Sequence, residues 1–273
     1  MRGGSAATPP GLLTIVKRLA DSLDELDRLR ASLDEVQRQM RQLAYITDAA
    51  GELGYPDPLA PLYRDFELRF RGSEEAIRER QLKWLNLLTP LFGDNRLPVV
   101  DVGPGRGEWL QLLASRGLVS LGVELNHEMA ERSREQGLQV VEADIVSWLQ
   151  DREDESVAFY TAFQVIEHIS TQQLATMLKE MTRTLAPGGG LAVETLNATS
   201  FSAYPWFYLD PTHRRFVHFE TVKWMAEAFG LINATVHFAE PPPRLNLTSQ
   251  VGIAIDDVLN GPIDYLMVAT KPR

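Results

Sequence analysis

The stretch VVDVGPGRGEWL, residues 99–110, indicates how this chain folds. An apolar run that ends in an acid is followed by glycines at the alternate positions 103, 105 and 107, and then by an amphipathic segment. This order is typical of a strand that turns sharply into a helix. Glycine allows the tight turn and the close approach of a ligand, and the first N–H groups of the helix suit a carboxylate or a phosphate. The dinucleotide pattern GxGxxG is not met because position 108 is glutamate, so a purely structural turn remains an alternative.

Strand and helix patterns alternate from residue 98 to the end of the chain. Apolar runs such as PVVDVG, SLGVEL and VAFYTAFQVI predict strands, and segments such as GEWLQLLASRG and TQQLATMLKEMTRTLAPGG predict helices. The alternation predicts an α/β fold with a seven-stranded, mostly parallel sheet, helices on both faces and a hairpin-like pair of strands at the end. Residues 197–219 and 241–262 interrupt the alternation, and excursions of this length usually carry function.

The first 50 residues differ in character from the rest of the chain. Residues 1–11 are rich in glycine, proline and small side chains, which predicts a disordered start. Residues 12–45 carry a heptad pattern in which charged residues separate two apolar seams. The first seam is Leu12, Leu19, Leu26, Leu33 and Met40, and the second is Ile15, Leu29, Val36 and Leu43, interrupted at Ser22. The pattern predicts a coiled-coil helix that joins copies of the chain, with an amphipathic helix packed on its own domain as the alternative.

A linker and a helical segment connect this region to the sheet. The Gly/Pro-rich residues 51–61 read as the linker, and a helical pattern follows over 62–91, where Ser73 is placed to cap the second half. We therefore expect three regions: a disordered start and coiled-coil helix over 1–50, a linker and helical lead-in over 51–94, and an α/β domain over 95–273.

Composition narrows the class of protein. The 273 residues are 44% hydrophobic and 23% charged, which is ordinary for a globular protein, and the net charge of −10 argues against nonspecific nucleic-acid binding. The absence of cysteine excludes a disulfide framework and a thiolate zinc site, and it fits a cytoplasmic protein. No sustained apolar core of a signal peptide and no run long enough to span a membrane is present, so we expect at most peripheral association with a membrane.

Two acids follow the glycine stretch at the ends of the next two predicted strands. Glu124 ends the second strand in LGVEL, where a carboxylate can accept hydrogen bonds from both hydroxyls of a ribose. Asp144 ends the third strand in VVEAD, where a carboxylate can accept from the amino group of an adenine. Each acid alone is more often a solvated group at a strand end. Together, in this order, they predict a site for adenosine that has no need of a pyrophosphate.

The successive motifs VVDVGPGRG, GVELN, VEADI, FQVIEHI and LAPGGGLAVET resemble those of class I S-adenosylmethionine-dependent methyltransferases. The resemblance covers residues 95–270, and it implies a Rossmann-like methyltransferase domain whose last strand is antiparallel. It also implies that Asp101 and the three glycines surround the methionine part of the cofactor. The other residues it places at the cofactor are Glu124 with Leu125 at the ribose, Asp144 with Ile145 at the adenine, and Gln164 on the methionine side.

A narrower resemblance runs from Tyr63 to Gly230. The segments FRGSEEAIRERQ, DVGPGRGEWL and FYLDPTHRRF are similar to those of methyltransferases of bacterial polysaccharide assembly, including those that terminate O-antigen chains. In that group an arginine–glycine pair ahead of the core approaches the cofactor, which points to Arg71 and Gly72. The sequence departs from the chain terminators because no kinase is appended, so a phosphorylated acceptor is not implied.

The candidate catalytic residues lie outside the cofactor motifs. A sugar hydroxyl is a poor nucleophile near neutral pH and benefits from a base, whereas a phosphate or carboxylate needs none. We predict that His213 in DPTHRR takes or orients the hydroxyl proton, that Asp210 sets the tautomer of its imidazole, and that His168 competes for the role of base. The aromatic segment SAYPWFYLDPTHRRF is expected to cover a sugar ring, with Tyr208, Arg214 and Arg215 binding the acceptor. No metal site is predicted: Asp210, His213 and Glu167 are of the right types, but their spacing does not show one.

Three functions remain open at this point. The first is an O-methyltransferase that acts on a glycan or sugar intermediate of cell-surface polysaccharide synthesis. The second is a methyltransferase for a small secondary metabolite, which an enclosed site would suit better than an open groove. The third is a scaffold that binds the cofactor and uses its coiled coil to organise partners, but the intact glycine loop and both acids favour an enzyme.

Overall fold

The computed structural model describes residues 28, 60–93, 96–242 and 259–273. Apart from Arg28, the heptads of residues 12–45 lie outside the described residues, and so do most of the 51–61 linker and of the 241–262 excursion. Among the described residues, no helix is both long enough and apolar enough to cross a membrane.

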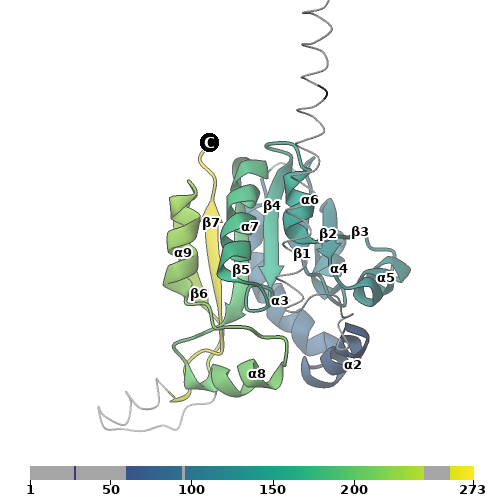
Figure 1. Ribbon diagram of the computed structural model, residues 1–273, viewed down its shortest axis with the longest axis vertical. Coiled ribbons are helices and arrows are strands. Elements are labelled where there is room, and N and C mark those ends of the chain that lie inside the picture. Colours follow the sequence, from purple (N-terminus) through teal and green to yellow (C-terminus); the bar gives the residue numbers. More distant parts are fainter. Residues whose placement is uncertain (1–27, 29–59, 94–95, 243–258) are drawn as a thin grey trace, which may run out of the picture. The chain divides into compact units, whose positions relative to one another are not determined.

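A single seven-stranded sheet organises residues 99–270, with the strand order β3-β2-β1-β4-β5-β7-β6 (Figure 1). Neighbouring strands are parallel from β3 to β5, and β7 is antiparallel to both β5 and β6. This confirms the predicted sheet with its reversed last strand. The strands are β1 Val99–Val102, β2 Ser120–Glu124, β3 Val140–Glu142, β4 Val157–Phe163, β5 Leu185–Leu196, β6 Ile232–Phe238 and β7 Asp264–Thr270.

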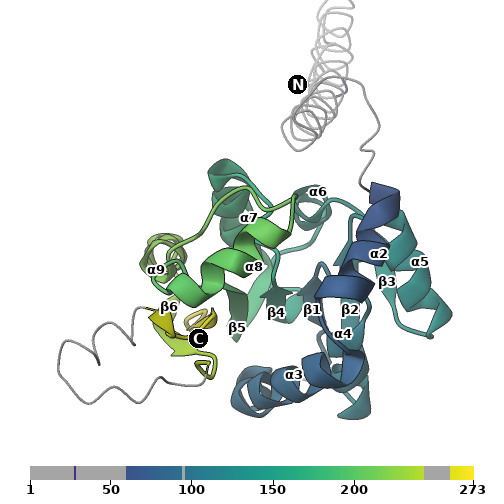
Figure 2. The same ribbon diagram turned by 90° about the horizontal axis from the view of Figure 1, so that it is seen from below.

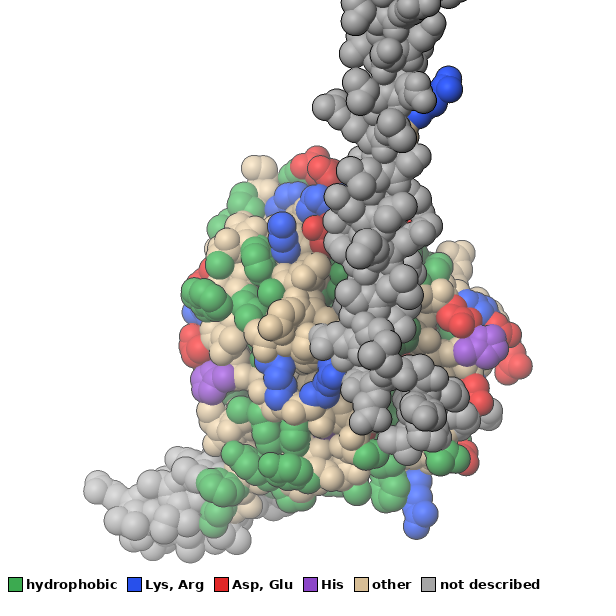
Figure 3. Space-filling view, in the orientation of Figure 1, with side chains coloured by type: hydrophobic (Ala, Val, Ile, Leu, Met, Phe, Trp, Pro, Cys, Tyr) green, Lys and Arg blue, Asp and Glu red, His purple; other side chains and the backbone are tan. Residues whose placement is uncertain are grey.

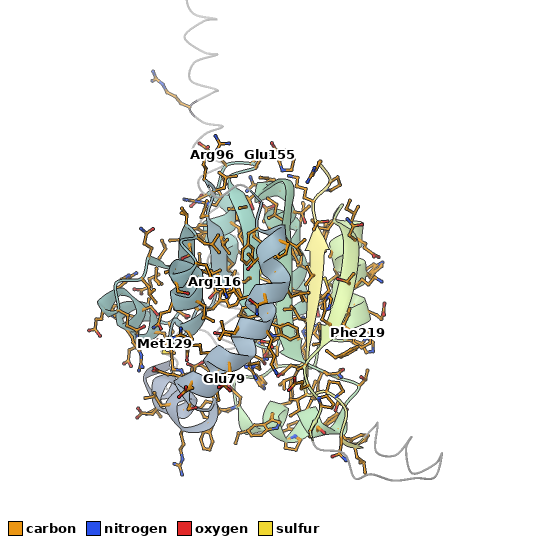
Figure 4. The ribbon with its side chains drawn as sticks, turned by 180° about the vertical axis from the view of Figure 1, so that it is seen from behind. Glu79, Arg96, Arg116, Met129, Glu155 and Phe219 are labelled. Atoms are coloured by element: carbon orange, nitrogen blue, oxygen red, sulfur yellow. The ribbon has the colours of Figure 1, made fainter. Side chains whose placement is uncertain are left out.

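Helices cover both faces of the sheet, as the alternation predicts. One face, toward the viewer in Figure 1, carries α6 Ile145–Gln150, α7 Thr171–Thr184 and α9 Phe219–Ala228. The other face, seen in Figure 4, carries α3 Glu74–Leu88, on which Glu79 is labelled, and α4 Glu108–Ser115. The remaining helices are α2 Ala60–Phe70, α5 His127–Glu135, α8 Tyr204–Leu209 and the short 3-10 turns η1 Thr89–Leu91 and η2 Phe201–Ala203.

Local chemistry sets the helix boundaries. The helical lead-in is broken at Gly72, which has φ +99°, and restarts at Ser73, whose hydroxyl accepts from the Ala76 N–H at 3.2 Å. This N-cap is the one predicted from the sequence. The α7 helix begins with a capping box, in which Ser170 and Gln173 satisfy each other's backbone N–H.

One layer of the core lies between the sheet and the α3–α4 face, and buried side chains of α7 and α9 form a second layer on the opposite face. Trp109 and Phe163 pack edge to face with ring centroids 4.8 Å apart, and Phe92 packs against Phe159 at 5.1 Å. The indole N–H of Trp84 donates to the buried Glu194 carboxylate at 2.8 Å, which ties α3 to β5. The strand ends that face α2 and α8 are therefore held on a rigid base, and these two helices lie at that end of the sheet (Figure 2).

Candidate active site

The glycine-rich loop joins β1 to α4, and all three glycines have positive φ, from +54° to +86°. Gly107 has φ +86°, which disfavours any side chain, and a Cβ there would also lie 2.5 Å from Leu138 Cδ1. A Cβ at Gly105 would instead lie 3.1 Å from the Arg71 guanidinium and 3.5 Å from the Glu67 carboxylate. The middle of the loop therefore faces charged side chains of the α2 segment.

Glu124 holds the loop from the end of β2. Its carboxylate accepts from the Gly105 N–H at 3.1 Å through Oε2 and from the Asn126 N–H at 2.9 Å through Oε1. The side chain is buried, and burial raises the pKa of its carboxyl although the backbone hydrogen bonds oppose the shift. Leu125, the next residue, is 67% exposed.

The other predicted cofactor residues on the sheet occupy neighbouring strand ends. Asp144 is the N-cap of α6, where its Oδ1 accepts from the Ser147 N–H at 2.8 Å, and Ile145 beside it is buried. Asp101 is buried on β1 and accepts from the Thr161 hydroxyl at 2.7 Å.

Arg71 and Glu67 form an ion pair over the loop, with Nη1 2.6 Å from Oε1. Burial opposes the charge of Arg71, but the carboxylates of Glu67 and Glu108 outweigh it and raise the pKa of the guanidinium. Arg71 Nε and Glu67 Oε2 are buried without a hydrogen-bond partner in the described part of the chain. Buried polar groups normally find a partner, so this place fits a charged, hydrogen-bonding ligand next to Gly105.

A cavity of about 350 Å³ opens beside this pair, between α2, α8 and the strand ends. Six of the predicted site residues line it: Arg71, Gly72, Gln164, His168, Asp210 and His213. Residues that the sequence did not single out also line it: Tyr63, Phe66, Glu67, Phe70, Arg80, Leu196, Trp206, Leu209, Ile263 and Asp264. Gln164 has φ +58° and donates to Asp264 Oδ1 at 3.1 Å, and Arg80 pairs with Asp264 Oδ2 at 3.3 Å.

The predicted acceptor residues of the DPTHRR segment and α8 do not line the described cavity. Tyr208 is 75% exposed, and the Arg214 side chain is exposed. Arg215 donates from Nε to the Ile169 carbonyl at 3.3 Å, which fastens the segment to the β4–α7 connection. The cations that line the cavity are Arg71 and Arg80.

Asp210 is the centre of a hydrogen-bond network at the cavity wall. Its Oδ2 accepts from the Tyr63 hydroxyl at 2.9 Å, and its Oδ1 accepts from the backbone N–H and the hydroxyl of Thr212 at 2.8 and 2.6 Å. Burial alone would raise the pKa of Asp210, but the hydrogen bonds from Thr212 outweigh it and the pKa is lowered. The carboxylate is therefore ionised near neutral pH.

The two histidines meet here with their rings 4.7 Å apart. His213 Nδ1 lies 2.8 Å from the Phe207 carbonyl, which can only accept, so Nδ1 carries the proton and Nε2 the lone pair. His168 Nδ1 lies 2.9 Å from the Thr212 hydroxyl, whose own proton goes to Asp210, so His168 is also protonated at Nδ1.

This corrects the role predicted for Asp210. Phe207 rather than Asp210 sets the His213 tautomer, and Asp210 Oδ2 lies 3.9 Å from His213 Nε2, on the lone-pair side of the ring. Burial lowers the pKa of His213, and burial together with the neighbouring His213 lowers the pKa of His168 to about 4. Both imidazoles are neutral at physiological pH.

Glu167 lies beneath the histidines and is fully buried. Its Oε2 accepts from the Thr195 hydroxyl at 2.7 Å, whereas Oε1 has no hydrogen-bond partner within the described residues and lies 4.0 Å from His213 Nε2. Its backbone carbonyl accepts from the Arg214 N–H at 2.9 Å, which holds the DPTHRR segment on the β4–α7 connection. Burial raises the pKa of the carboxyl to about 8.

The buried carboxyl groups predict that stability falls as the pH rises. Burial raises the pKa of Asp101 to about 8, far above the ordinary value of 3.8 expected in the unfolded chain. Its contribution is fully present below about pH 4 and is lost as the pH rises toward 8. We expect the free energy of unfolding, measured with urea, to be lower at pH 9 than at pH 6. The difference should shrink in Asp101→Asn and persist in a control at the exposed Asp65, Asp65→Asn; equal pH dependence in both variants would contradict the assignment.

The reversed last strand, the glycine loop after β1 and the acid at the end of β2 are the features of S-adenosylmethionine-dependent methyltransferases. Residues 76–236, more than half of the chain, match the family model described as a methyltransferase domain, so the chain belongs to this family and is an enzyme of this class.

Solved structures agree with this membership. An S-adenosylmethionine-dependent methyltransferase from Archaeoglobus fulgidus is 29% identical, with a TM-score of 0.68 over 77% of this chain and 99% of that one. A second such methyltransferase, from Thermotoga maritima, is 21% identical, with a TM-score of 0.56 over 78% of this chain and 97% of that one. Phosphoethanolamine N-methyltransferase 2 of Haemonchus contortus shares the fold at 18% identity, with a TM-score of 0.51 over 77% of this chain and 60% of that one. No curated protein matches the chain.

Proposed function

We propose that this methyltransferase transfers the methyl group of S-adenosylmethionine to a hydroxyl of a glycan or sugar intermediate in cell-surface polysaccharide synthesis. One observation carries the proposal. A single cavity joins Arg71 and Gly72, beside the glycine loop, to His168, Asp210 and His213. Groups suited to hold a methyl donor therefore share one cavity with groups suited to activate an acceptor.

The cofactor end is proposed at the carboxyl ends of β1 and β2. The sulfonium of S-adenosylmethionine supplies an electrophilic methyl group, and the protein must hold and orient it. Glu124, with Leu125 beside it, would accept from the ribose hydroxyls, Asp144 with Ile145 would hold the adenine, and Arg71 would bind the carboxylate of the methionine part. Gly72, Asp101, Gly103, Gly105, Gly107 and Gln164 complete the proposed cofactor residues.

The acceptor end is proposed at the two histidines. A sugar hydroxyl must lose its proton as the oxygen attacks, and groups with lone pairs in the cavity assist that loss. The neutral His213 exposes its Nε2 lone pair beside Asp210, which supports its role as the principal residue that activates the hydroxyl.

Aromatic side chains around the cavity support a sugar acceptor. Phe66, Phe70 and Trp206 line it, and Trp206 on α8 is 50% exposed. Hydrophobic side chains gather over α8 on the surface as well (Figure 3). Aromatic faces stack on the apolar faces of sugar rings, so α8 offers a platform for further units of a chain-like acceptor.

The platform predicts the effect of removing Trp206. Trp206→Ala should raise KM for a glycan acceptor by roughly 10-fold while kcat changes little, because stacking binds the ground state and the transition state alike. Trp224→Ala is the matched control, since Trp224 on α9 is exposed and does not line the described cavity. Steady-state kinetics with both variants test this, and equal KM values would argue against the platform.

The proposed function is tested by incubating the full chain with radiolabelled S-adenosylmethionine and fractionated cell-envelope glycans. We expect label in a glycan fraction, and we expect it to resist mild alkali because a methyl ether does so. Alkali-labile label would indicate a carboxylate acceptor, and label recovered as methyl phosphate after hydrolysis of the glycan would indicate a phosphate acceptor. Transfer only to small phenolic or amine metabolites would favour the metabolite enzyme, and cofactor binding without turnover on any fraction would favour the scaffold.

Self-association through residues 12–45 is proposed from the heptads alone, since these residues lie outside the described part of the chain. Leu26→Lys with Leu33→Lys places charge in the first seam and should lower the assembly to a smaller mass in light scattering. A chain that starts at Gly51 is expected to match that smaller mass. Equal masses for all three proteins would show that residues 12–45 do not hold the assembly together.

A further inference from the structure

We propose that Glu167, His168 and His213 hold a divalent transition-metal ion at the acceptor end of the cavity. The inference rests on the proposed function for its purpose, but its evidence is the geometry of these three side chains. One ligand atom from each lies within 4.8 Å of the other two. Metal–ligand distances near 2.0–2.2 Å would require the cluster to contract by on the order of 1 Å, which small rotamer changes can supply.

The tautomers of both histidines suit metal binding. Each Nδ1–H donates to a fixed oxygen, the Phe207 carbonyl for His213 and the Thr212 hydroxyl for His168. The Nε2 lone pairs are therefore the ones available to a ligand. Metal-bound histidines almost always donate their other N–H to such a partner, which fixes the ring and its tautomer.

The two carboxylate oxygens of Glu167 likewise differ, because one is held by a hydrogen bond and the other is available to a ligand. Thr195 donates to Oε2, while Oε1 is buried and without a hydrogen-bond partner in the described part of the chain. When Glu167 is ionised, its buried Oε1 and the His213 Nε2 lone pair 4.0 Å away are two acceptors that face each other. A cation satisfies both, and the competing occupants are a proton on Glu167 Oε1 that points toward the imidazole and a water that donates to both.

The donor set points to the class of metal. Two imidazoles and one carboxylate suit Fe²⁺, Co²⁺, Ni²⁺ or Zn²⁺ better than Mg²⁺ or Ca²⁺, which prefer all-oxygen sites. Because His168 and His213 line the cavity, an ion held by them would have a face open to the acceptor. A bound hydroxyl oxygen of the acceptor would become more acidic, and the ionised Asp210, 3.9 Å from His213 Nε2, is placed to take its proton.

Co²⁺ is the probe for this site, because its visible absorption reports on the ligands. Isothermal titration calorimetry of the full chain with Co²⁺ should give one bound ion per chain. The visible absorption spectrum of the complex should be that of an ion bound by nitrogen and oxygen ligands. Glu167→Gln and His213→Ala should each weaken binding by roughly 30-fold or more, by comparison with the 10–100-fold losses typical when only an outer partner of a metal site is removed. His127→Ala is the matched control, because His127 is exposed and pairs with Glu142 away from the cavity.

Thermal unfolding of each variant verifies that it is folded before it is titrated. Failure to bind one Co²⁺ per chain, or equal affinity in Glu167→Gln, His213→Ala and the parent chain, would refute the metal site and favour a proton or a bridging water between Glu167 and His213. Full methyl transfer by protein that is shown to be free of metal would refute the proposed metal site and would leave the proposed function unaffected. Site-specific Co²⁺ binding without transfer to any glycan would support the ion and refute the proposed acceptor.

Discussion

Replacement of His213 by alanine is expected to lower the rate of methyl transfer roughly 10²–10⁴-fold, the usual contribution of a group that assists proton loss. The Nε2 lone pair faces the cavity because Nδ1–H is fixed on the Phe207 carbonyl. The loss is expected whether the imidazole takes the hydroxyl proton itself or holds a cation that acidifies the hydroxyl, because both roles need this lone pair. Single-turnover kinetics with saturating cofactor and glycan measure the effect on the chemical step.

Cofactor affinity separates this effect from a general disturbance of the site. Calorimetry should give the parent affinity for S-adenosylmethionine in His213→Ala, and His127→Ala should retain the parent rate. His168→Ala is expected to lose less than His213→Ala, because in the proposed function His213 is the principal residue that activates the hydroxyl. Near-normal turnover by His213→Ala would rule the role out and would point to His168, or to an acceptor such as a phosphate that needs no activation.

The fold was predictable because its signals are local. The alternation of apolar runs and amphipathic segments identifies the parallel sheet, and the break in the helical lead-in follows from Gly72 and the cap at Ser73. The three loop glycines have positive φ because they form the tight turn between a strand and a helix. Each of these features depends on a few residues that are neighbours in the chain, so it can be predicted from the sequence alone.

The candidate site was predictable only in part, because several of its contacts join segments far apart in the sequence. Tyr63 reaches Asp210, and Arg80 reaches Asp264, only after α2 and α3 pack at the strand ends. Asp264 is the first residue of β7, and it lies beside the last residue of β5 because β7 runs in the opposite direction. The reversed last strand was the signal that could have found it.

The roles of the histidines depended on backbone groups that no side-chain motif reveals. The sequence places Asp210 near His213 and suggests that the acid sets the tautomer. The Phe207 carbonyl takes that role instead, because the chain after α8 folds back and brings His213 Nδ1 to a backbone oxygen of the helix. Tyr208, Arg214 and Arg215 were predicted as acceptor residues because aromatic and basic side chains suit a sugar. Their side chains are not among those that line the described cavity.

Glu124→Ala is expected to weaken the binding of S-adenosylmethionine by about 1.5–3 kcal/mol, or roughly 10- to 150-fold, because a charge-assisted contact to the ribose is lost. Glu142→Ala is the matched control. Glu142 pairs with Glu124 in the register of β2 and β3 but is exposed, so its loss should leave the affinity unchanged. Because Glu124 also holds the Gly105 N–H, thermal unfolding of the variant must show that the domain is still folded.

Gly105→Val tests the same end of the site through the backbone. A β-branched residue is strained at φ +54°, and its Cβ would lie 3.1 Å from the Arg71 guanidinium, where the methionine part of the cofactor is proposed to bind. We expect the loss of affinity in Gly105→Val to exceed that in Glu124→Ala, because the strained loop and the displaced Arg71 act on the same ligand. Calorimetry at one pH and salt concentration measures both variants. If both variants bind S-adenosylmethionine with the affinity of the parent chain, the cofactor does not bind at the ends of β1 and β2.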